Sequence, residues 1–224
     1  MTVPAFAADT FEYPELLVAP RASERLEMEA RAESESRWSR FAPIQVSALA
    51  TLLTGITQSG GVDLRNDPSK RSPIAGYAVG GGWLAATLIL SATYRPYESG
   101  SAEVKGLPKG SPREQLVRER MAEEAIERAA SLGKRLKWVS AATNLGANLY
   151  MVSNSEGGTF AKTSGAVAMA LSLTPLIFPS RWELIACEQR EYKKKIYAPI
   201  ASLGTLVEPV TLKPAPGLSL SFSF

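Results

Sequence analysis

Residues 41–62, FAPIQVSALATLLTGITQSGGV, contain no charged side chain, and neither do residues 72–94, SPIAGYAVGGGWLAATLILSATY. Two further uncharged runs cover residues 138–155 and 163–180. A helix of about 20 apolar residues can cross the roughly 30 Å hydrocarbon core of a membrane. The four runs therefore predict four helices at membrane depth, near residues 43–60, 73–94, 136–153 and 161–178.

A charged amphipathic stretch precedes the first run and the third. These stretches are Pro20–Phe41 and Ser111–Lys137, in which acidic and basic residues alternate so that neighbouring helical turns can pair. Charged residues make up 21% of the chain, an ordinary share, because the charges are segregated rather than few. The same order of segments occurs twice. We therefore predict a mainly α membrane protein with two repeated helical hairpins, charged amphipathic helices and a short C-terminal β segment.

The same pattern divides the chain into four parts. Ala5-Phe6-Ala7 fits the cleavage site of a secretory signal, although the charged and apolar parts of such a signal do not precede it. Prolines and glycines in residues 95–110 favour an extended linker, whereas no breaker separates the second charged helix from Trp138. The expected parts are the end of a signal (1–8), the first helix-plus-hairpin unit with its linker (9–110), the second unit (111–197) and a β tail (198–224).

Small residues recur along the uncharged runs, often four positions apart, which places them on one face of a helix. Such faces let two helix backbones approach closely in a membrane, where no hydrophobic force draws helices together. We expect these residues to lie at helix contacts or against lipid: Gly76, Gly80, Gly81, Gly82, Ala85, Gly146 and Gly165.

Polar and aromatic side chains in and beside the runs predict two further features. Asn144 and Asn148 share one helical face, and with Gln45 they would either form inter-helix hydrogen bonds or line a lumen. Trp38 and Trp138 occupy matching places, where each charged stretch meets its uncharged run. Tryptophan is favoured at a membrane–water interface, so both are expected there.

The C-terminal tail has the alternation of a β-strand. Leu218, Leu220, Phe222 and Phe224 alternate with serines, and Thr205–Leu212 can form a preceding strand with a turn at residues 213–217. One or two strands leave unpaired edges, so we expect the tails of neighbouring subunits to complete a shared sheet.

The composition argues against an enzyme. The chain has no histidine and one cysteine, which removes the usual nucleophile–histidine arrangements and histidine metal sites. Its net charge of +3 comes from interleaved acids and bases, so no broad cationic surface for nucleic acid is expected. We expect no catalytic residue, no metal and no cofactor, with bound phospholipid as the one non-protein component allowed.

Three segments and the final residue resemble a known family. The N-terminal Phe11-Glu12-Tyr13-Pro14-Glu15-Leu16, the helix beginning Pro20-Arg21-Ala22-Ser23-Glu24-Arg25, the hairpins and the terminal Phe224 resemble the PopA-type, porin-like outer-membrane proteins of predatory bacteria. This resemblance implies a ring-shaped homo-oligomer, with five subunits favoured, whose helices enclose membrane lipid. It also implies an outer-membrane location in a Gram-negative bacterium, with the inner membrane as the alternative.

Two other functions remain open from the residues. A small channel or transporter built from repeated hairpins would place Asn144 and Asn148 near its pathway, since internal repeats are common in transporters. A soluble exported helical scaffold would instead bury the uncharged runs in protein. The need for detergent separates the scaffold from the other two, and solute flux separates a channel from a protein that holds lipid.

Overall fold

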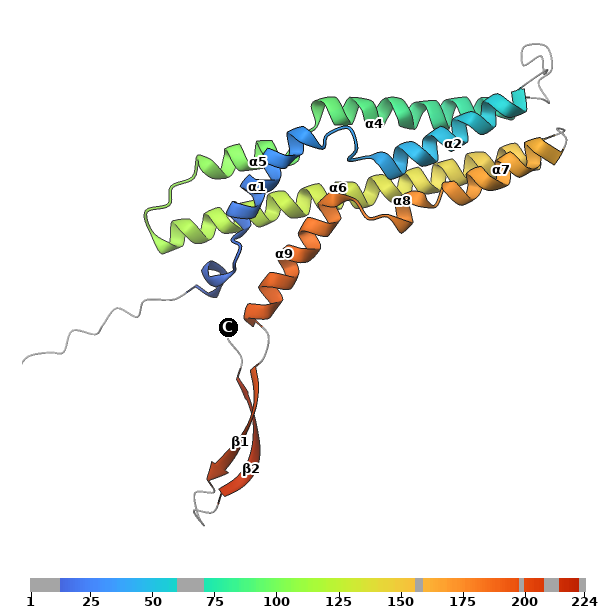
Figure 1. Ribbon diagram of the computed structural model, residues 1–224. Coiled ribbons are helices and arrows are strands. Elements are labelled where there is room, and N and C mark those ends of the chain that lie inside the picture. Colours follow the sequence, from blue (N-terminus) through green and yellow to red (C-terminus); the bar gives the residue numbers. More distant parts are fainter. Residues whose placement is uncertain (1–12, 60–70, 156–158, 198–199, 208–213, 222–224) are drawn as a thin grey trace, which may run out of the picture.

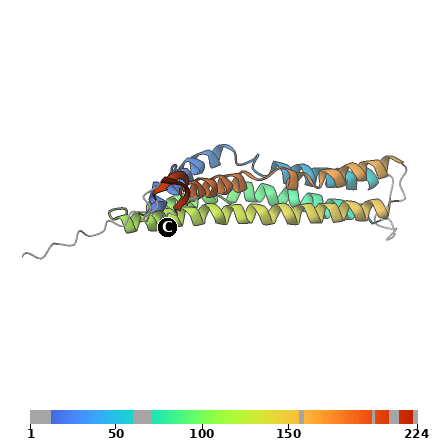
Figure 2. The same ribbon diagram turned by 90° about the horizontal axis from the view of Figure 1, so that it is seen from below.

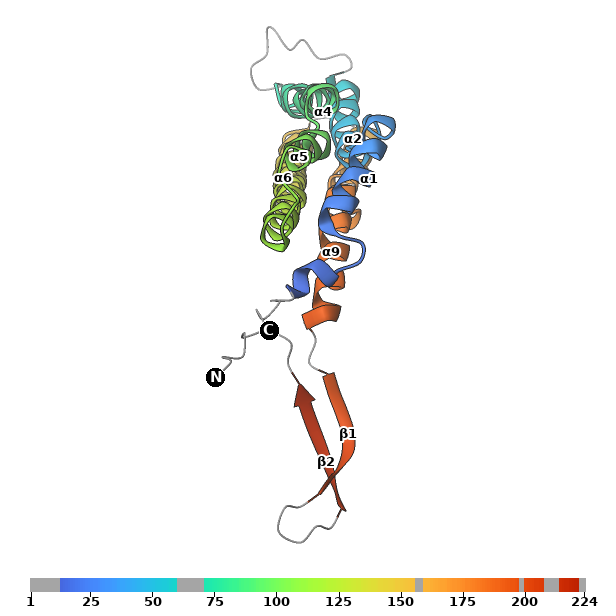
Figure 3. The ribbon, with the colours of Figure 1, turned by 90° about the vertical axis from the view of Figure 1, so that its left-hand side faces the viewer.

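The computed structural model describes residues 13–59, 71–155, 159–197, 200–207 and 214–221. These residues are mainly helical, and the helices form an elongated bundle around one long helix, α6 (Pro112–Ser153) (Figure 1). Viewed end-on, α4, α5 and α6 lie on one side, with α1, α2 and α9 on the other (Figure 3). The expectations that fall on residues 1–12, Phe222 and Phe224 lie outside the described residues.

Helices occupy all four uncharged runs. The first run forms α2 (Ala42–Ser59), and the second forms a nearly continuous helix from α3 (Pro73–Gly76) through the π-helical turn η3 (Tyr77–Gly81) to α4 (Gly82–Thr93). The third run is the C-terminal part of α6, and the fourth forms α7 (Thr159–Leu171) and α8 (Thr174–Ile177). Together these elements form an apolar half at one end of the bundle (Figures 1 and 2).

The charged stretches form the other half. A short 3-10 helix, η1 (Pro14–Leu17), precedes α1 (Ala22–Glu35), and α9 (Arg181–Tyr197) packs against α6. As expected, α6 runs through Trp138 without a break. Its start is fixed by Ser111, whose Oγ accepts the Glu114 N–H while the Glu114 carboxylate accepts the Ser111 N–H.

Two sequence expectations about this half are wrong. The linker at 95–110 is largely helical, as α5 (Pro96–Lys105), because a carboxylate distant in sequence caps it: Glu33 Oε2 accepts the N–H groups of Tyr97 and Glu98, both at 3.0 Å. The charged stretch Pro20–Phe41, expected as one amphipathic helix, is α-helical only as far as Glu35. A turn follows, in which the Arg40 guanidinium donates back to the Glu33 carbonyl at 3.0 Å.

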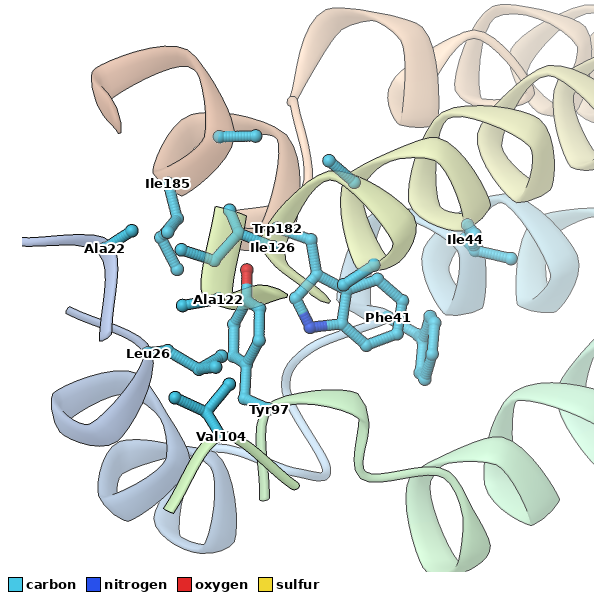
Figure 4. Packing of buried hydrophobic residues seen from close by; sticks show 13 residues of the cluster. Ala22, Leu26, Phe41, Ile44, Tyr97, Val104, Ala122, Ile126, Trp182 and Ile185 are labelled. Atoms are coloured by element: carbon cyan, nitrogen blue, oxygen red, sulfur yellow. The ribbon is translucent and has the colours of Figure 1, made fainter. Parts of the chain in front are cut away.

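A cluster of buried apolar side chains lies in the charged half and reaches its junction with the apolar half. Leu26, Tyr97, Ile126 and Trp182 converge there from α1, α5, α6 and α9 (Figure 4). Phe41 meets the Trp182 ring edge-on, with centroids 5.6 Å apart, an arrangement that adds to the burial of both rings. This cluster joins the start of α2 to the charged half.

The chain ends in two antiparallel strands, β1 (Ile200–Val207) and β2 (Pro214–Ser221), which project away from α9 (Figure 1). Their register pairs Leu203 with Leu218 and Ala201 with Leu220. The strand boundaries differ from expectation: Pro214–Gly217, expected in a turn, belongs to β2, where the prolines lie in a sheet of two edge strands.

Candidate membrane-facing surface

The apolar half exposes most of its apolar side chains. Among the described residues, two of the four predicted membrane-depth helices lie in stretches that contain segments long and apolar enough to cross a membrane, Pro73–Lys105 and Thr159–Lys195. By the same length and composition, α2 and α6 do not qualify. Only 22% and 28% of those segments are buried, whereas the core helix of a soluble protein is mostly buried. The exposed side chains include Val46, Leu49, Leu53, Ile56, Leu88, Ile89, Val139, Leu149, Phe160, Val167 and Ile177.

Glycine allows the closest helix approaches in this half. A Cβ atom on Gly80 would lie 2.6 Å from the Ala48 carbonyl oxygen of α2, and one on Gly76 would lie 2.7 Å from the Gly55 Cα. A Cβ on Gly165 would clash with the Val152 side chain of α6. At these positions a larger residue would separate the helices.

The other small residues of the predicted set do not lie at helix contacts. A Cβ atom placed on Gly81, Gly82 or Gly146 would have nothing within 4 Å except the backbone of its own helix. Ala85 is exposed. Within one chain these four therefore do not pack against another helix, and the alternative that they lie against lipid stays a prediction. Four-residue spacing places residues on one face, but it does not say which face meets a neighbouring helix.

Gly55 is a contact residue that the sequence analysis missed. It faces Gly76 across the junction of α2 and α3, where its own Cβ would lie 2.9 Å from the Pro73 carbonyl oxygen. The signal was present in the sequence, because Ser47, Thr51 and Gly55 recur every four residues along α2.

Asn148 joins three segments of the apolar half. Its side chain is fully buried, and its Nδ2 donates to Thr51 Oγ1 of α2 at 2.8 Å and to Ser172 Oγ, just after α7, at 2.9 Å. Thr51 and Ser172 in turn donate to carbonyls of their own helices. The result is a hydrogen-bonded link between helices that are otherwise apolar.

The other two amides behave differently. Asn144 is also fully buried, but its Nδ2 donates to Ser140 within α6 and not to another helix. Gln45 is half-buried at the end of the first turn of α2. Because Asn144 and Asn148 are both enclosed by protein, neither lines an open passage within one chain.

A groove runs between α2 and α7 on the outside of the bundle. It has a volume of about 470 Å³, within the range of small-molecule sites, and is open to the exterior. Thr57 and Ser164 are 3.5 Å apart at one end. Apart from Phe160, Thr54 and Thr163, the other lining side chains are aliphatic. The lining residues are Val46, Leu49, Ala50, Leu53, Thr54, Thr57, Phe160, Thr163, Ser164, Val167, Ala168 and Leu171.

Both predicted interface tryptophans are exposed at the junction of the two halves. Trp38 is 51% exposed in the turn between α1 and α2, where the Arg37 guanidinium lies 5.1 Å from its ring centroid. Trp138 is 56% exposed on α6. Both indoles therefore lie where the charged half ends and the apolar half begins.

A buried ion pair at the same junction was not anticipated. The Arg40 Nη1 lies 3.1 Å from Glu33 Oε1, with the two side chains 5% and 2% exposed. Burial raises the pKa of Glu33, although Arg40 and the backbone N–H groups of Glu98 and Tyr97 oppose it. Burial likewise raises the pKa of Tyr97. The pair holds the turn before α2 in place. Acidic and basic residues alternate closely along this part of the sequence, and that pattern does not indicate which of them become buried.

Within the described ranges, no group of three or more acidic, cysteine or histidine side chains lies close enough together to hold a metal ion. Comparisons with protein-family models, with curated proteins and with solved structures found no match.

Proposed function

We propose that this protein is a non-enzymatic membrane protein whose copies assemble into a ring that encloses membrane lipid. The observation that carries the proposal is the exposed apolar half: its two candidate spans are long enough to cross a bilayer, yet little of either is buried within one chain. An exposed apolar surface of this size marks contact with lipid or with another subunit. We interpret the apolar half as two repeated hairpins at membrane depth.

The groove between α2 and α7 supports lipid as the bound component. It follows the helices from Thr57 to Val46, which is roughly 16 Å at 1.5 Å per residue. A groove that follows two helices over this length, with a mostly apolar lining, suits part of an acyl chain. The hydroxyls of Thr57 and Ser164 at one end suit the ester region of a phospholipid.

Two features support self-association. The outward-facing Gly81, Gly82, Ala85 and Gly146 would permit close contact with helices of another copy. In the described part of the tail, β1 and β2 pair only with each other, so each has an edge without a strand partner. Pairing of such edges between copies would close a sheet, and the resemblance to PopA-type proteins favours five copies.

The outer membrane of a Gram-negative bacterium is the proposed location, with the inner membrane as the alternative. Both suggestions come from the resemblance and from Ala5-Phe6-Ala7 in the sequence. A channel is the second reading, and no specific observation favours it, because the amides that would line a pathway are buried between helices.

The test is a mass measurement of the assembly extracted into polymer-bounded native membrane discs, with lipid analysis of the same sample. We expect several copies of the chain and more phospholipid than a belt around the outside would hold. A monomer, or extraction without any membrane-solubilising agent, would overturn the proposal. Liposome flux of small solutes above that of protein-free vesicles would instead favour the channel.

A further inference from the structure

Along one exposed face of α6, the type of side chain changes at the junction of the two halves. Lys134 and Arg135 are exposed, and Trp138 follows one turn later on the same face. Beyond Trp138 the exposed residues are apolar or small, beginning with Val139 and continuing to Gly146 and Leu149. Along one continuous helix, the face is therefore cationic, then aromatic, then apolar.

Neither cation is neutralised by a carboxylate among the described residues. The positions three and four residues from Lys134 and Arg135 carry no acid. Nearby acids are already paired: Glu127 accepts two hydrogen bonds from Arg190 at 2.6 Å, and Glu183 pairs with Lys137. The two charges therefore remain available to an external anion.

These side chains lie at the level where a bilayer surface would be. Three segments lie beside the middle of α6, at the junction of the charged and apolar halves (Figure 1). They are the turn between α1 and α2, the end of α4 and the start of α9. Arg37 and Trp38 lie in the first of these segments. From Trp138 to Ser153, α6 extends roughly 23 Å beyond this level, about three quarters of the roughly 30 Å depth of a hydrocarbon core.

We propose that Lys134 and Arg135 bind the phosphate of an anionic membrane phospholipid, with Trp138 at the ester level and an acyl chain along the outward face of α6. This inference rests on the proposed membrane location. A guanidinium offers a planar pair of donors to phosphate oxygens, and an ammonium adds a compact charge beside it. Gly146 carries no side chain on this face, so an acyl chain can approach the helix backbone there.

The experiment uses the purified full-length chain in a neutral detergent, titrated with dioleoyl phosphatidylglycerol or dioleoyl phosphatidylcholine and followed by native mass spectrometry. Each basic residue near a membrane surface contributes about a fivefold gain in affinity for anionic lipid. Replacing both, as Lys134→Gln with Arg135→Gln, should therefore weaken phosphatidylglycerol binding by about 30-fold and leave phosphatidylcholine binding unchanged. Raising the salt concentration should reduce the preference of the wild type.

The matched control is Lys109→Gln with Arg113→Gln. It removes the same two charge types from exposed positions, Lys109 just before α6 and Arg113 in its first turn, and Arg113 lies roughly 30 Å from Lys134 along the helix. The control should bind phosphatidylglycerol as the wild type does. Circular dichroism of both variants establishes that each retains its helices.

Three outcomes would overturn the proposal: equal phosphatidylglycerol affinity in the two double variants, no preference for phosphatidylglycerol over phosphatidylcholine in the wild type, or displacement of the lipid by an equal concentration of inorganic phosphate. The mass of the assembly is measured in the same spectra. A monomer that still prefers phosphatidylglycerol would refute the ring and support the headgroup site. An intact ring without that preference would support the ring and refute the headgroup site.

Discussion

Gly80 in η3 lies so close to Ala48 of α2 that a Cβ atom on Gly80 would be 2.6 Å from the Ala48 carbonyl oxygen. Backbone groups cannot move aside as a flexible side chain can. A Cβ atom on the neighbouring Gly81 would have no atom of another segment within 4 Å. Two adjacent glycines therefore differ completely in what they contact, which provides a matched pair for mutation.

We expect Gly80→Ala to destabilise the protein by about 1–3 kcal/mol, the usual effect of overpacking, because α2 and η3 must separate. Gly81→Ala should leave stability unchanged or raise it by up to about 1 kcal/mol, since alanine is the better helix former. Thermal unfolding in detergent measures both. Equal melting temperatures for the two variants would show that the α2–η3 contact is not close in solution.

The Asn148–Thr51 hydrogen bond should stabilise the apolar half modestly. Bonds of this kind between membrane helices contribute about 0.6–2 kcal/mol, because the unfolded helices also find partners. We expect Asn148→Ala and Thr51→Val to be less than additive in a double-mutant cycle, with a coupling energy in that range. Strict additivity would mean that the two side chains do not interact.

Breaking the Glu33–Arg40 pair should be costly near neutral pH. Arg40→Leu leaves a buried carboxylate without its cation, which typically destabilises by about 3–5 kcal/mol. The double variant Glu33→Gln with Arg40→Leu removes both charges and should recover part of that loss. Chemical denaturation at pH 7 measures both variants, and an equal loss in the two would show that the uncompensated charge is not the cause.

The same pair predicts a pH dependence. The pKa of Glu33 is raised on folding, mainly by burial. Its contribution is therefore fully present below the unfolded pKa, near 4.3, and is lost as the pH rises through the folded pKa. Relative to Glu33→Gln, the wild type should gain stability as the pH falls from 7 toward 5. The gain should be larger in Arg40→Leu than in wild type, and unfolding curves across that range test it.

Removing Leu218–Phe224 should disrupt the assembly. The deletion takes the second half of β2, including the residues paired with Leu203, Ser202, Ala201 and Ile200. If the tails of neighbouring copies share a sheet, the truncated protein should run as smaller species in size-exclusion chromatography with light scattering. An unchanged mass and membrane location would show that the tail does not hold the copies together.

Much of the secondary structure could be predicted from local composition. The uncharged runs are helical, as their length and lack of charge predict for segments at membrane depth. The Ser111–Glu114 cap could be predicted from four residues. The helix α5 could not be predicted, since its first N–H groups are capped by Glu33, more than 60 residues earlier. Local sequence gave only the prolines and glycines that argue against a helix.

The sequence by itself determined where charge is present and where it is absent, and hence the two halves of the bundle and the tryptophans at their junction. Only the tertiary structure decided that Gly80 meets a backbone while Gly81 meets open space, and that Asn148 bonds to other helices while Asn144 bonds to its own. Charge segregation is a property of successive residues. Which side of a helix is covered depends on its rotation against neighbours that lie far away in the chain.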